Sequence, residues 1–273
     1  MLPVMTQAAT RAAVTVRDVR GADELRACQE LQRKAWGITE DGYVVPVATM
    51  ASAQRVGGLI LGAFDARQSL IGFAFAFLGK LNDRLVLWSQ LTGVHPAHQS
   101  TGVGRMLKFE QRRHAREMGL DAVAWAFDPL QASNAAFNLG VLGATSRRYE
   151  PDMYGSRTDA LNVGLATDRL LVEWSTHGDP GGQTTPIADS FDLIETSSGA
   201  PLAMRALPFD ARMLQIEIPP RIADLKGLHA SAAREWQAAI REAFAAAFEA
   251  GYVAVGFTRA DPSRPRYLLE RTR

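Results

Sequence analysis

The stretch Val94-His95-Pro96-Ala97-His98-Gln99-Ser100-Thr101-Gly102-Val103-Gly104-Arg105 decides the fold, because it joins a predicted strand to a predicted helix through a Gln-x-x-Gly-x-Gly turn. Residues 85–94 are mostly apolar and β-branched, which is typical of a buried strand. Downstream, Gly119 stands where a C-cap is expected, and the polar positions, Lys108 among them, predict a solvated face. The apolar positions recur at helical spacing and are Val103, Met106, Leu107, Ala115 and Met118.

The turn predicts an anion site. Gly102 and Gly104 have no Cβ, so a ligand can approach the backbone closely, and the N–H groups of a first helical turn have no partners within the helix. These donors and the positive end of the helix dipole attract an anion such as a pyrophosphate. A glycine pair at a helix start can instead serve only the close packing of helix on strand. The Gly-x-x-x-x-Gly-Lys nucleotide loop is excluded, because Lys108 lies four residues beyond the second glycine.

The pattern resembles motif A of the GNAT superfamily of N-acetyltransferases, in which (Gln/Arg)-x-x-Gly-x-(Gly/Ala) follows a Val-x-Pro strand exit. Val94, Pro96, Gln99, Gly102 and Gly104 match it. The resemblance implies a GNAT fold, with the pyrophosphate of acetyl-CoA, or of another acyl-CoA, held at this turn. It also implies direct transfer of the acyl group to a primary amine, without a covalent intermediate.

A second part of the motif matches residues 128–144. GNAT enzymes carry an Asn and a short helix ending in Leu-Gly after the next strand, and Asn134, Leu142 and Gly143 fit. Ser133 or Asn134 can equally be a plain N-cap. The segments 127–130, 148–149 and 168–174 extend the resemblance to a group of bacterial predicted acetyltransferases that carry a long C-terminal extension.

The chain departs from the family pattern where chemistry is expected. Acyl transfer needs a base for the amine and a proton for the departing thiolate. Trp88 falls near the usual strand carboxylate, with Gln90 close by, and the short helix has no Tyr. We therefore predict Asp128 as the base or water-orienting group and Tyr154 as the general acid. A turn role for Asp128 and a surface or core role for Tyr154 stay open.

The oxyanion of the reacting thioester needs a donor, which the resemblance places on the backbone of residues 92–94. Gly93 suits a bulge there, and the splay of this strand from the next would leave backbone groups free to pair with pantetheine. The residues predicted to bind acyl-CoA are Thr92, Gly93, Val94, Gln99, Ser100, Thr101, Gly102, Val103, Gly104, Arg105 and Asn134.

Composition excludes several classes of function. Thirty Lys and Arg against 29 Asp and Glu give a net charge of +1, which favours neither nucleic acid nor an anionic membrane as a partner. Cys28 is the only cysteine, and the five histidines show no metal spacing, so no metal site is expected. No apolar run reaches the roughly 20 residues of a membrane span. We expect a cytoplasmic monomer or homodimer that acts on a small-molecule or peptide amine.

The predicted fold class is α+β, a mixed α/β sandwich with the order β-α-α-β-β-β-α-β up to residue 127, as in a GNAT core with a central, splayed mixed sheet. Hydrophobic residues make up 47% of the 273 residues, enough for a packed core. Four ranges are predicted: a disordered terminus (1–13), the acetyl-CoA-binding catalytic domain (14–175), a linker (176–188) and a degenerate GNAT-like β-α-β-β half that packs on the core (189–273). In that half the strand-to-helix junction has Pro219-Pro220 in place of Gly-x-Gly, so no second active site is expected.

Overall fold

A computed structural model describes residues 14–155, 157, 163–182, 184, 190–197, 199–208 and 210–272. The predicted disordered terminus, 1–13, lies outside these residues. Two compact units are present: the first comprises Met1–Phe77 and Leu91–Gln111, and the second comprises Leu78–Gln90 and Arg112–Arg273. This division does not follow the ranges 14–175 and 189–273, which stay a prediction.

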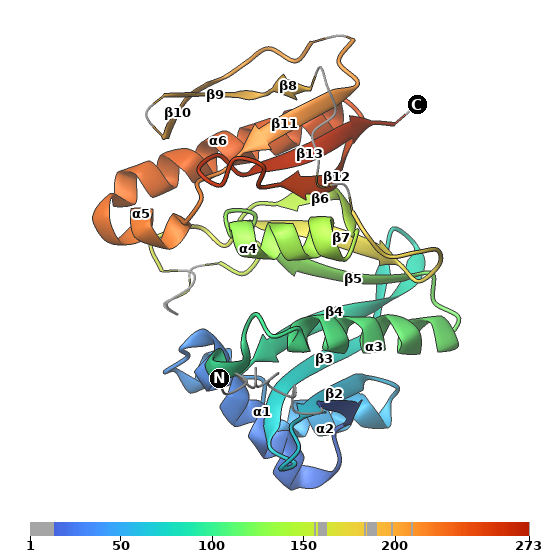
Figure 1. Cartoon of the computed structure of the whole chain (residues 1–273). Coiled ribbons are helices and arrows are strands. Elements are labelled where there is room, and N and C mark those ends of the chain that lie inside the picture. The colour runs from blue at the N-terminus through green and yellow to red at the C-terminus, as the bar shows by residue number, and fades with distance from the viewer. Residues whose placement is uncertain are drawn as a thin grey trace, which may run out of the picture. The chain divides into compact units, whose positions relative to one another are not determined.

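The first unit has the element order that the sequence predicts (Figure 1). Its strands follow the order β1-β2-β3-β4, and β2 pairs antiparallel with both β1 and β3. Strands β3 and β4 and helix α3 each continue into the second unit. The elements are β1 Thr15–Asp18, α1 Gly21–Trp36, η1 Asp41–Tyr43, α2 Val47–Arg55, β2 Leu59–Phe64, β3 Leu70–Leu81, β4 Arg84–Val94, η2 Pro96–His98 and α3 Val103–Glu117.

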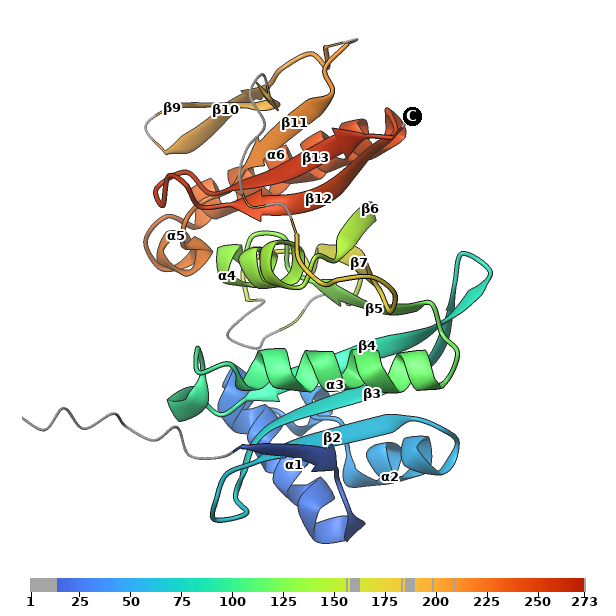
Figure 2. The same cartoon turned by 45° about the vertical axis from the view of Figure 1, so that its right-hand side comes forward.

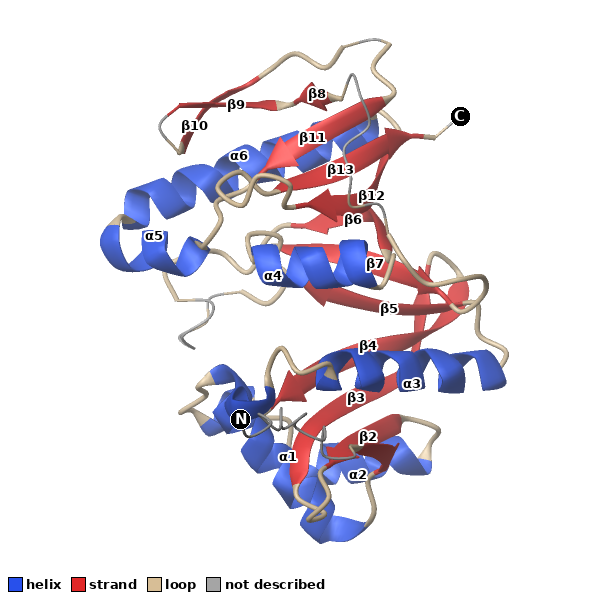
Figure 3. Ribbon diagram, in the orientation of Figure 1, coloured by secondary structure: helices blue, strands red, loops and turns tan. Residues whose placement is uncertain are grey.

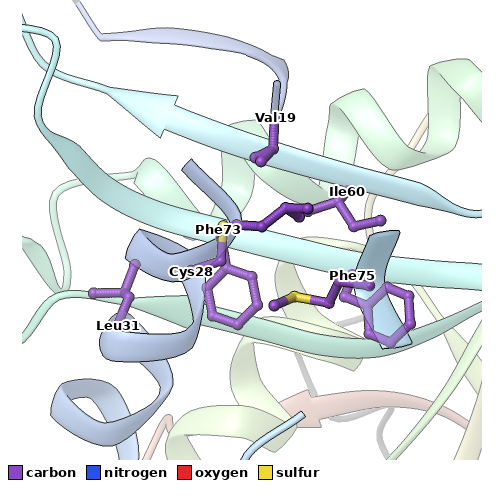
Figure 4. Close-up of a cluster of buried hydrophobic side chains, with 8 residues drawn as sticks. Val19, Cys28, Leu31, Ile60, Phe73 and Phe75 are labelled. Carbon is purple, nitrogen blue, oxygen red and sulfur yellow. The ribbon is translucent and has the colours of Figure 1, made fainter. Parts of the chain in front are cut away.

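Helices cover both faces of the sheet of the first unit. On one face, α1 and α2 bury Cys28, Leu31 and Met50 against Ile60 and the phenylalanines of β3 (Figure 4). Burial raises the pKa of the Cys28 thiol to about 12, so this cysteine is a core residue and no nucleophile at neutral pH. Because successive side chains of a strand point to opposite faces, the sheet also has a second face to be covered.

On the other face, α3 packs closely on β3. A Cβ on Gly72 would lie 2.7 Å from Val103 Cγ1 and 3.1 Å from Leu107 Cδ1. Only glycine therefore lets the first turn of α3 approach the sheet at this point. The position of the predicted anion turn is fixed by this contact, because Val103 is the first residue of the helix.

The second unit contains the strand order β4-β5-β7-β6-β12-β13-β11-β8 and a separate β9-β10 hairpin (Figure 3). β4 and β5 are parallel and pair at Leu87–Val123 and Trp88–Ala124. Its elements are β5 Ala122–Phe127, α4 Ala132–Ala135, η3 Ala136–Val141, β6 Thr145–Glu150, β7 Arg169–Ser175, β8 Phe191–Asp192, β9 Ile194–Ser197, β10 Ala200–Met204, β11 Met213–Glu217, α5 Ile222–Leu228, α6 Ala230–Glu249, β12 Tyr252–Thr258 and β13 Arg266–Arg271.

The C-terminal elements share one sheet with β5–β7, since β12 pairs with β6 at Ala254–Ser146. Helix α6 packs against β10, β12, β6 and β11 (Figures 1 and 2). Along the chain, β11, α6, β12 and β13 give the predicted β-α-β-β order, and α5 is an unpredicted addition. In space β13 lies between β11 and β12, whereas β4 and β5 are direct neighbours. The fold class is α+β, a mixed sheet with flanking helices.

Candidate functional site

The turn after β4 is a preformed backbone loop in the first unit. A short 3₁₀ turn at Pro96–His98 ends β4, and the Gln99 amide nitrogen donates to the Val94 carbonyl at 3.3 Å. The Thr101 hydroxyl donates to the His98 carbonyl at 2.7 Å. These bonds close the turn on itself, so the Gln99 side chain holds the loop in shape.

Left-handed backbone orients the turn toward the helix. Ser100 has φ 62° and Gly102 has φ 95°, both in the region that favours glycine. The first helical bond of α3 runs from Met106 N–H to the Gly102 carbonyl at 3.0 Å. The N–H groups of Gly102, Val103 and Gly104 precede it, and no acceptor for them lies among the described residues. Three backbone donors are thus free to bind an anion.

The two glycines of the turn are not needed for packing. A Cβ on Gly102 would meet nothing within 4 Å, and a Cβ on Gly104 would meet only Val94 Cγ2, at 3.7 Å. By contrast, Gly72 and Gly93 are glycines because neighbouring side chains leave no room for a Cβ. This contrast favours the ligand interpretation of the Gly102–Gly104 pair over the packing interpretation.

The strand residues predicted to contact the acyl-CoA have different surroundings. Gly93 is buried, and its Cβ would lie 2.9 Å from the Phe73 ring and 3.2 Å from Trp36, so packing explains this glycine and its φ is not positive. Thr92 Oγ1 is buried and has no hydrogen-bond partner among the described residues. Val94 contributes its carbonyl to Gln99. A bulge and the predicted splay between β4 and β5 stay predictions.

Helix α3 differs from its predicted pattern. Val103, Leu107 and Ala115 are buried as expected, but Met106 is 40% exposed and Lys108 only 4% exposed. The buried face is centred on Leu107, Gln111 and Ala115, and at 100° per residue Lys108 falls within it. Burial lowers the pKa of Lys108 to about 7. The prediction of a solvated Lys108 was therefore wrong.

Arg105 is exposed on the first turn of α3, and its guanidinium lies 4.5 Å from the centre of the Phe109 ring. This cation–π contact directs the charge along the helix and leaves its N–H groups at the surface. Nearby, the rings of His95 and His98 are 6.0 Å apart. Arg105 is the only Lys or Arg side chain of residues 92–105, and it lies at the start of the helix that the glycine turn opens.

Asp128 lies in the second unit, at the end of β5, and its carboxylate closes a turn. Oδ1 accepts the Leu130 N–H at 2.9 Å, and Oδ2 accepts from the Gln131 side chain at 3.3 Å. Burial raises the pKa of this carboxyl, while its hydrogen bonds and the charges of Arg169 and Lys226 act in the opposite direction. The turn role that the sequence left open is therefore real. It does not conflict with proton transfer, since a raised pKa strengthens a carboxylate base.

Tyr154 follows β6 in the same unit and is 42% exposed. Its backbone N–H donates to Thr167 Oγ1 at 2.8 Å, and the Arg169 guanidinium lies 5.2 Å from its ring centre. Partial burial raises the pKa of the phenol and keeps it protonated at neutral pH. Arg169 is thus a neighbour of both Asp128 and Tyr154, which the sequence did not predict.

Asn134 is exposed within α4, whose N-cap is Gln131, so neither Ser133 nor Asn134 is the cap. The helix continues as the π-helical turn η3. As the sequence indicates, η3 contains no Tyr. On β4, the Trp88 indole donates to the Gln90 side chain at 2.8 Å, and neither residue is a carboxylate.

Sequence reasoning missed a buried ion pair behind the Tyr154 turn. Asp168 is 1% exposed and accepts hydrogen bonds from the Tyr149 hydroxyl at 2.7 Å and from both Nε and Nη2 of Arg241, at 2.9 and 2.7 Å. It also accepts the Asp152 N–H at 3.0 Å. Helix α6 is thereby tied to β6 and to the segment that carries Tyr154. The only sequence signal was an acidic residue directly before the apolar run of β7.

Metal binding and membrane insertion are two other classes of function on which the structure bears. No group of three or more His, Cys, Asp or Glu side chains able to hold a metal ion is present in the described ranges. Among the helices that the structure describes, none has the length and apolar character required to cross a membrane.

No protein-family profile matches the chain, and no curated protein does. Solved structures match it. The ribosomal-protein-S18-alanine N-acetyltransferase from Escherichia coli is similar over 61% of this chain and 96% of its own, with 16% identity and a TM-score of 0.47. A putative acetyltransferase from Salmonella typhimurium with its cofactor acetyl-CoA is similar over 65% of this chain and 99% of its own, with 19% identity and a TM-score of 0.45.

A third match is a GCN5-related glucosamine N-acetyltransferase region in a fungal multi-domain β-N-acetylglucosaminidase, with 20% identity and a TM-score of 0.37. It covers 52% of this chain, which spans only 16% of that protein. With TM-scores below 0.5, these likenesses say nothing about the acceptor or the reaction of this chain. Two further solved structures that match are described as acetyltransferases of the GNAT family, one of them as putative.

Proposed function

We propose that this protein is an N-acyltransferase that binds acetyl-CoA, or another acyl-CoA, and transfers the acyl group to a primary amine of a small molecule or peptide. One observation carries the proposal. The N–H groups of Gly102, Val103 and Gly104 have no acceptor in the described part of the chain, at a helix start where both glycines have open space above Cα. Such a surface is suited to a pyrophosphate.

In the proposed reaction the amine nitrogen attacks the thioester carbonyl carbon, the bond to sulfur breaks, the amine loses a proton and the thiolate gains one. Asp128 accepts the amine proton, directly or through water, and its raised pKa makes it a stronger base than a surface carboxylate. Tyr154 donates to the thiolate, because its raised pKa keeps the phenol protonated. A backbone N–H of residues 92–94 would stabilise the negative charge that develops on the thioester oxygen.

The test is transfer of isotopically labelled acetyl groups from acetyl-CoA to a panel of small amines and short peptides. On an accepted amine, Asp128→Asn and Tyr154→Phe should each lower kcat by about 10²–10⁴-fold, the usual contribution of general acid–base catalysis. Asp121→Asn is the matched control, since Asp121 lies at the opposite end of β5 and is exposed. Wild-type turnover in Tyr154→Phe would remove the tyrosine from the mechanism. A pH–rate profile in Asp128→Asn that is the same as that of wild type would remove the carboxylate.

A non-catalytic acyl-CoA-binding or interaction module is the second candidate. It is favoured by the Trp88–Gln90 hydrogen bond on β4, where neither residue is a carboxylate, and by the absence of Tyr from residues 132–141. Binding of coenzyme A without labelled product from any amine of the panel would favour this candidate over the enzyme.

A further inference from the structure

A groove in the second unit lies outside the proposed acyl-CoA site. It is formed where β11 and β12 end, between the loop that joins β12 to β13 and helix α5, and it has a volume of about 750 Å³. That volume lies within the range of small-molecule sites. β11 and β12 both end at this groove, and the antiparallel β13 between them begins here.

The walls of the groove are apolar and fixed. Four prolines line it, Pro219, Pro220, Pro262 and Pro265, together with Leu225. Each proline ring locks its own φ, so little backbone order is lost when a ligand binds. The Ile218 N–H donates to the Pro265 carbonyl at 3.0 Å, which joins the end of β11 to the start of β13.

The β12–β13 loop is held by its own hydrogen bonds. Asp261 Oδ1 accepts from the Ser263 N–H at 2.9 Å and from the Ser263 hydroxyl at 2.6 Å. The Arg264 N–H donates to the Asp261 carbonyl at 3.1 Å. The groove is therefore formed before any ligand arrives.

The groove has one uncompensated positive charge. Arg221 donates through Nε to Asp224 Oδ2 at 2.8 Å, so these two lining charges neutralise each other. Arg264, behind the wall, pairs with the buried Glu217 at 2.7 Å. Arg259 lines the groove and is exposed, and no carboxylate of the described residues lies within ion-pair distance of it. A guanidinium beside apolar walls favours an anion that presents a planar, bidentate group.

We propose that this groove binds a small carboxylic acid with an apolar body, with the carboxylate on Arg259 and the apolar body against the prolines and Leu225. A single charge fits a monoanion better than a phosphorylated ligand, which would need several cationic partners. The ligand belongs to a class different from coenzyme A, and the site does not depend on the proposed acyl transfer.

The test uses the full chain and benzoate and hexanoate as probes, with calorimetry and saturation-transfer NMR as readouts. Both acids should bind saturably, at one site per chain, and Arg259→Gln should weaken the binding at least tenfold. Arg259→Lys should retain part of the affinity, because it keeps the charge and loses the bidentate fork. Arg116→Gln is the matched control, as an exposed arginine of the same unit outside the groove.

Benzamide, which has the same body and no charge, should bind at least tenfold more weakly than benzoate. The proposal is overturned by the absence of saturable binding up to about 10 mM, well above the millimolar range of a weak site. It is also overturned by equal binding of benzoate to wild type and Arg259→Gln, or by equal binding of benzamide and benzoate. Preference for a peptide with a free C-terminus over both acids would overturn the small-molecule class.

Discussion

Two strand-to-helix junctions of this chain have opposite chemistry. After β4, the Gly102–Gly104 segment opens α3 with N–H groups that have no acceptor among the described residues. After β11, Pro219 and Pro220 lead into α5, and two prolines carry no N–H at all. The comparison teaches that a strand followed by a helix does not make an anion site. We expect an anion only where backbone donors, free space at glycine and a left-handed turn coincide, and of the two junctions only the first has all three.

The long helices near the two junctions, α3 and α6, differ as well, although α5 separates α6 from Pro220. The buried face of α3 includes Lys108 and Gln111, whereas the buried face of α6 is built from Ala233, Trp236, Ile240, Phe244 and other apolar residues, with Gln237 as its polar member. Phe244 stacks on Tyr149 at 5.6 Å and meets Tyr267 edge-on at 5.0 Å. The first helix thus carries polar groups into a buried surface, and the second is a packing element.

The largest expected effect concerns the second helix. Asp168→Ala leaves Arg241 and Tyr149 without their acceptor and should cost about 2–3 kcal/mol of unfolding free energy. This is below the full cost of breaking a buried pair, because the Arg241 side chain is 42% exposed and can be solvated. Urea unfolding measures it, and hydrogen exchange at residues 150–155 should rise. A loss below about 0.5 kcal/mol, the level of an ordinary surface substitution, would show that α6 is held by apolar packing alone.

The next effect concerns the polar face of α3 and depends on pH. The folded pKa of Lys108, about 7, lies below that of an unfolded lysine, so between about pH 7 and 10.5 the unfolded chain binds a proton that the folded chain does not. This group therefore adds stability as the pH rises through that window. Below about pH 7 the Lys108 side chain is protonated in both the folded and the unfolded chain. The cost of burying its positive charge then lowers the free energy of unfolding in full.

Lys108→Met removes this dependence. Relative to wild type, the variant should gain more than about 1 kcal/mol at pH 6, and the gain should shrink toward pH 10. Lys34→Met, at an exposed site of the same unit, should show no such trend. Parallel stability–pH curves for wild type and Lys108→Met would contradict the assigned pKa.

The smallest expected effect is at the second junction itself. Replacing Pro219 and Pro220 with glycine supplies the missing N–H groups, yet it does not supply the left-handed turn and the helix start of Gly102–Gly104. Coenzyme A should still bind once per chain, with unchanged affinity. A second binding event in the double variant would mean that backbone donors alone decide the difference between the junctions.

Local patterns predicted much of this fold. The periodicity of apolar residues predicted the order of the elements up to residue 127, and the predicted strand 85–94 differs from β4 by one residue at its start. The strand–turn–helix at residues 94–105 was predictable for the same reason, because all of its parts lie within a dozen consecutive residues, and its role as an anion site stays a prediction. Such features depend on neighbours in the chain, and the sequence displays them directly.

What the sequence could not display depends on distant partners. Asp168 meets Arg241 across 73 positions, and Tyr149 joins them from a third element. Lys108 is a charged residue, a type that usually faces solvent, and tertiary packing buries it. The short strands β8, β9 and β10 and the π-helical turn η3 carry no periodic signal, since each is too brief to show one.

Calorimetric titration of coenzyme A into wild type, Gly104→Val and Gly42→Val tests the central claim most directly. A Cβ at either glycine has room, so both variants should fold. Wild type and Gly42→Val should bind one coenzyme A per chain, and Gly104→Val should bind more than tenfold more weakly, a loss above about 1.4 kcal/mol. Unchanged affinity in a folded Gly104→Val, or two coenzyme A molecules per wild-type chain, would contradict the assignment of the pyrophosphate to this turn.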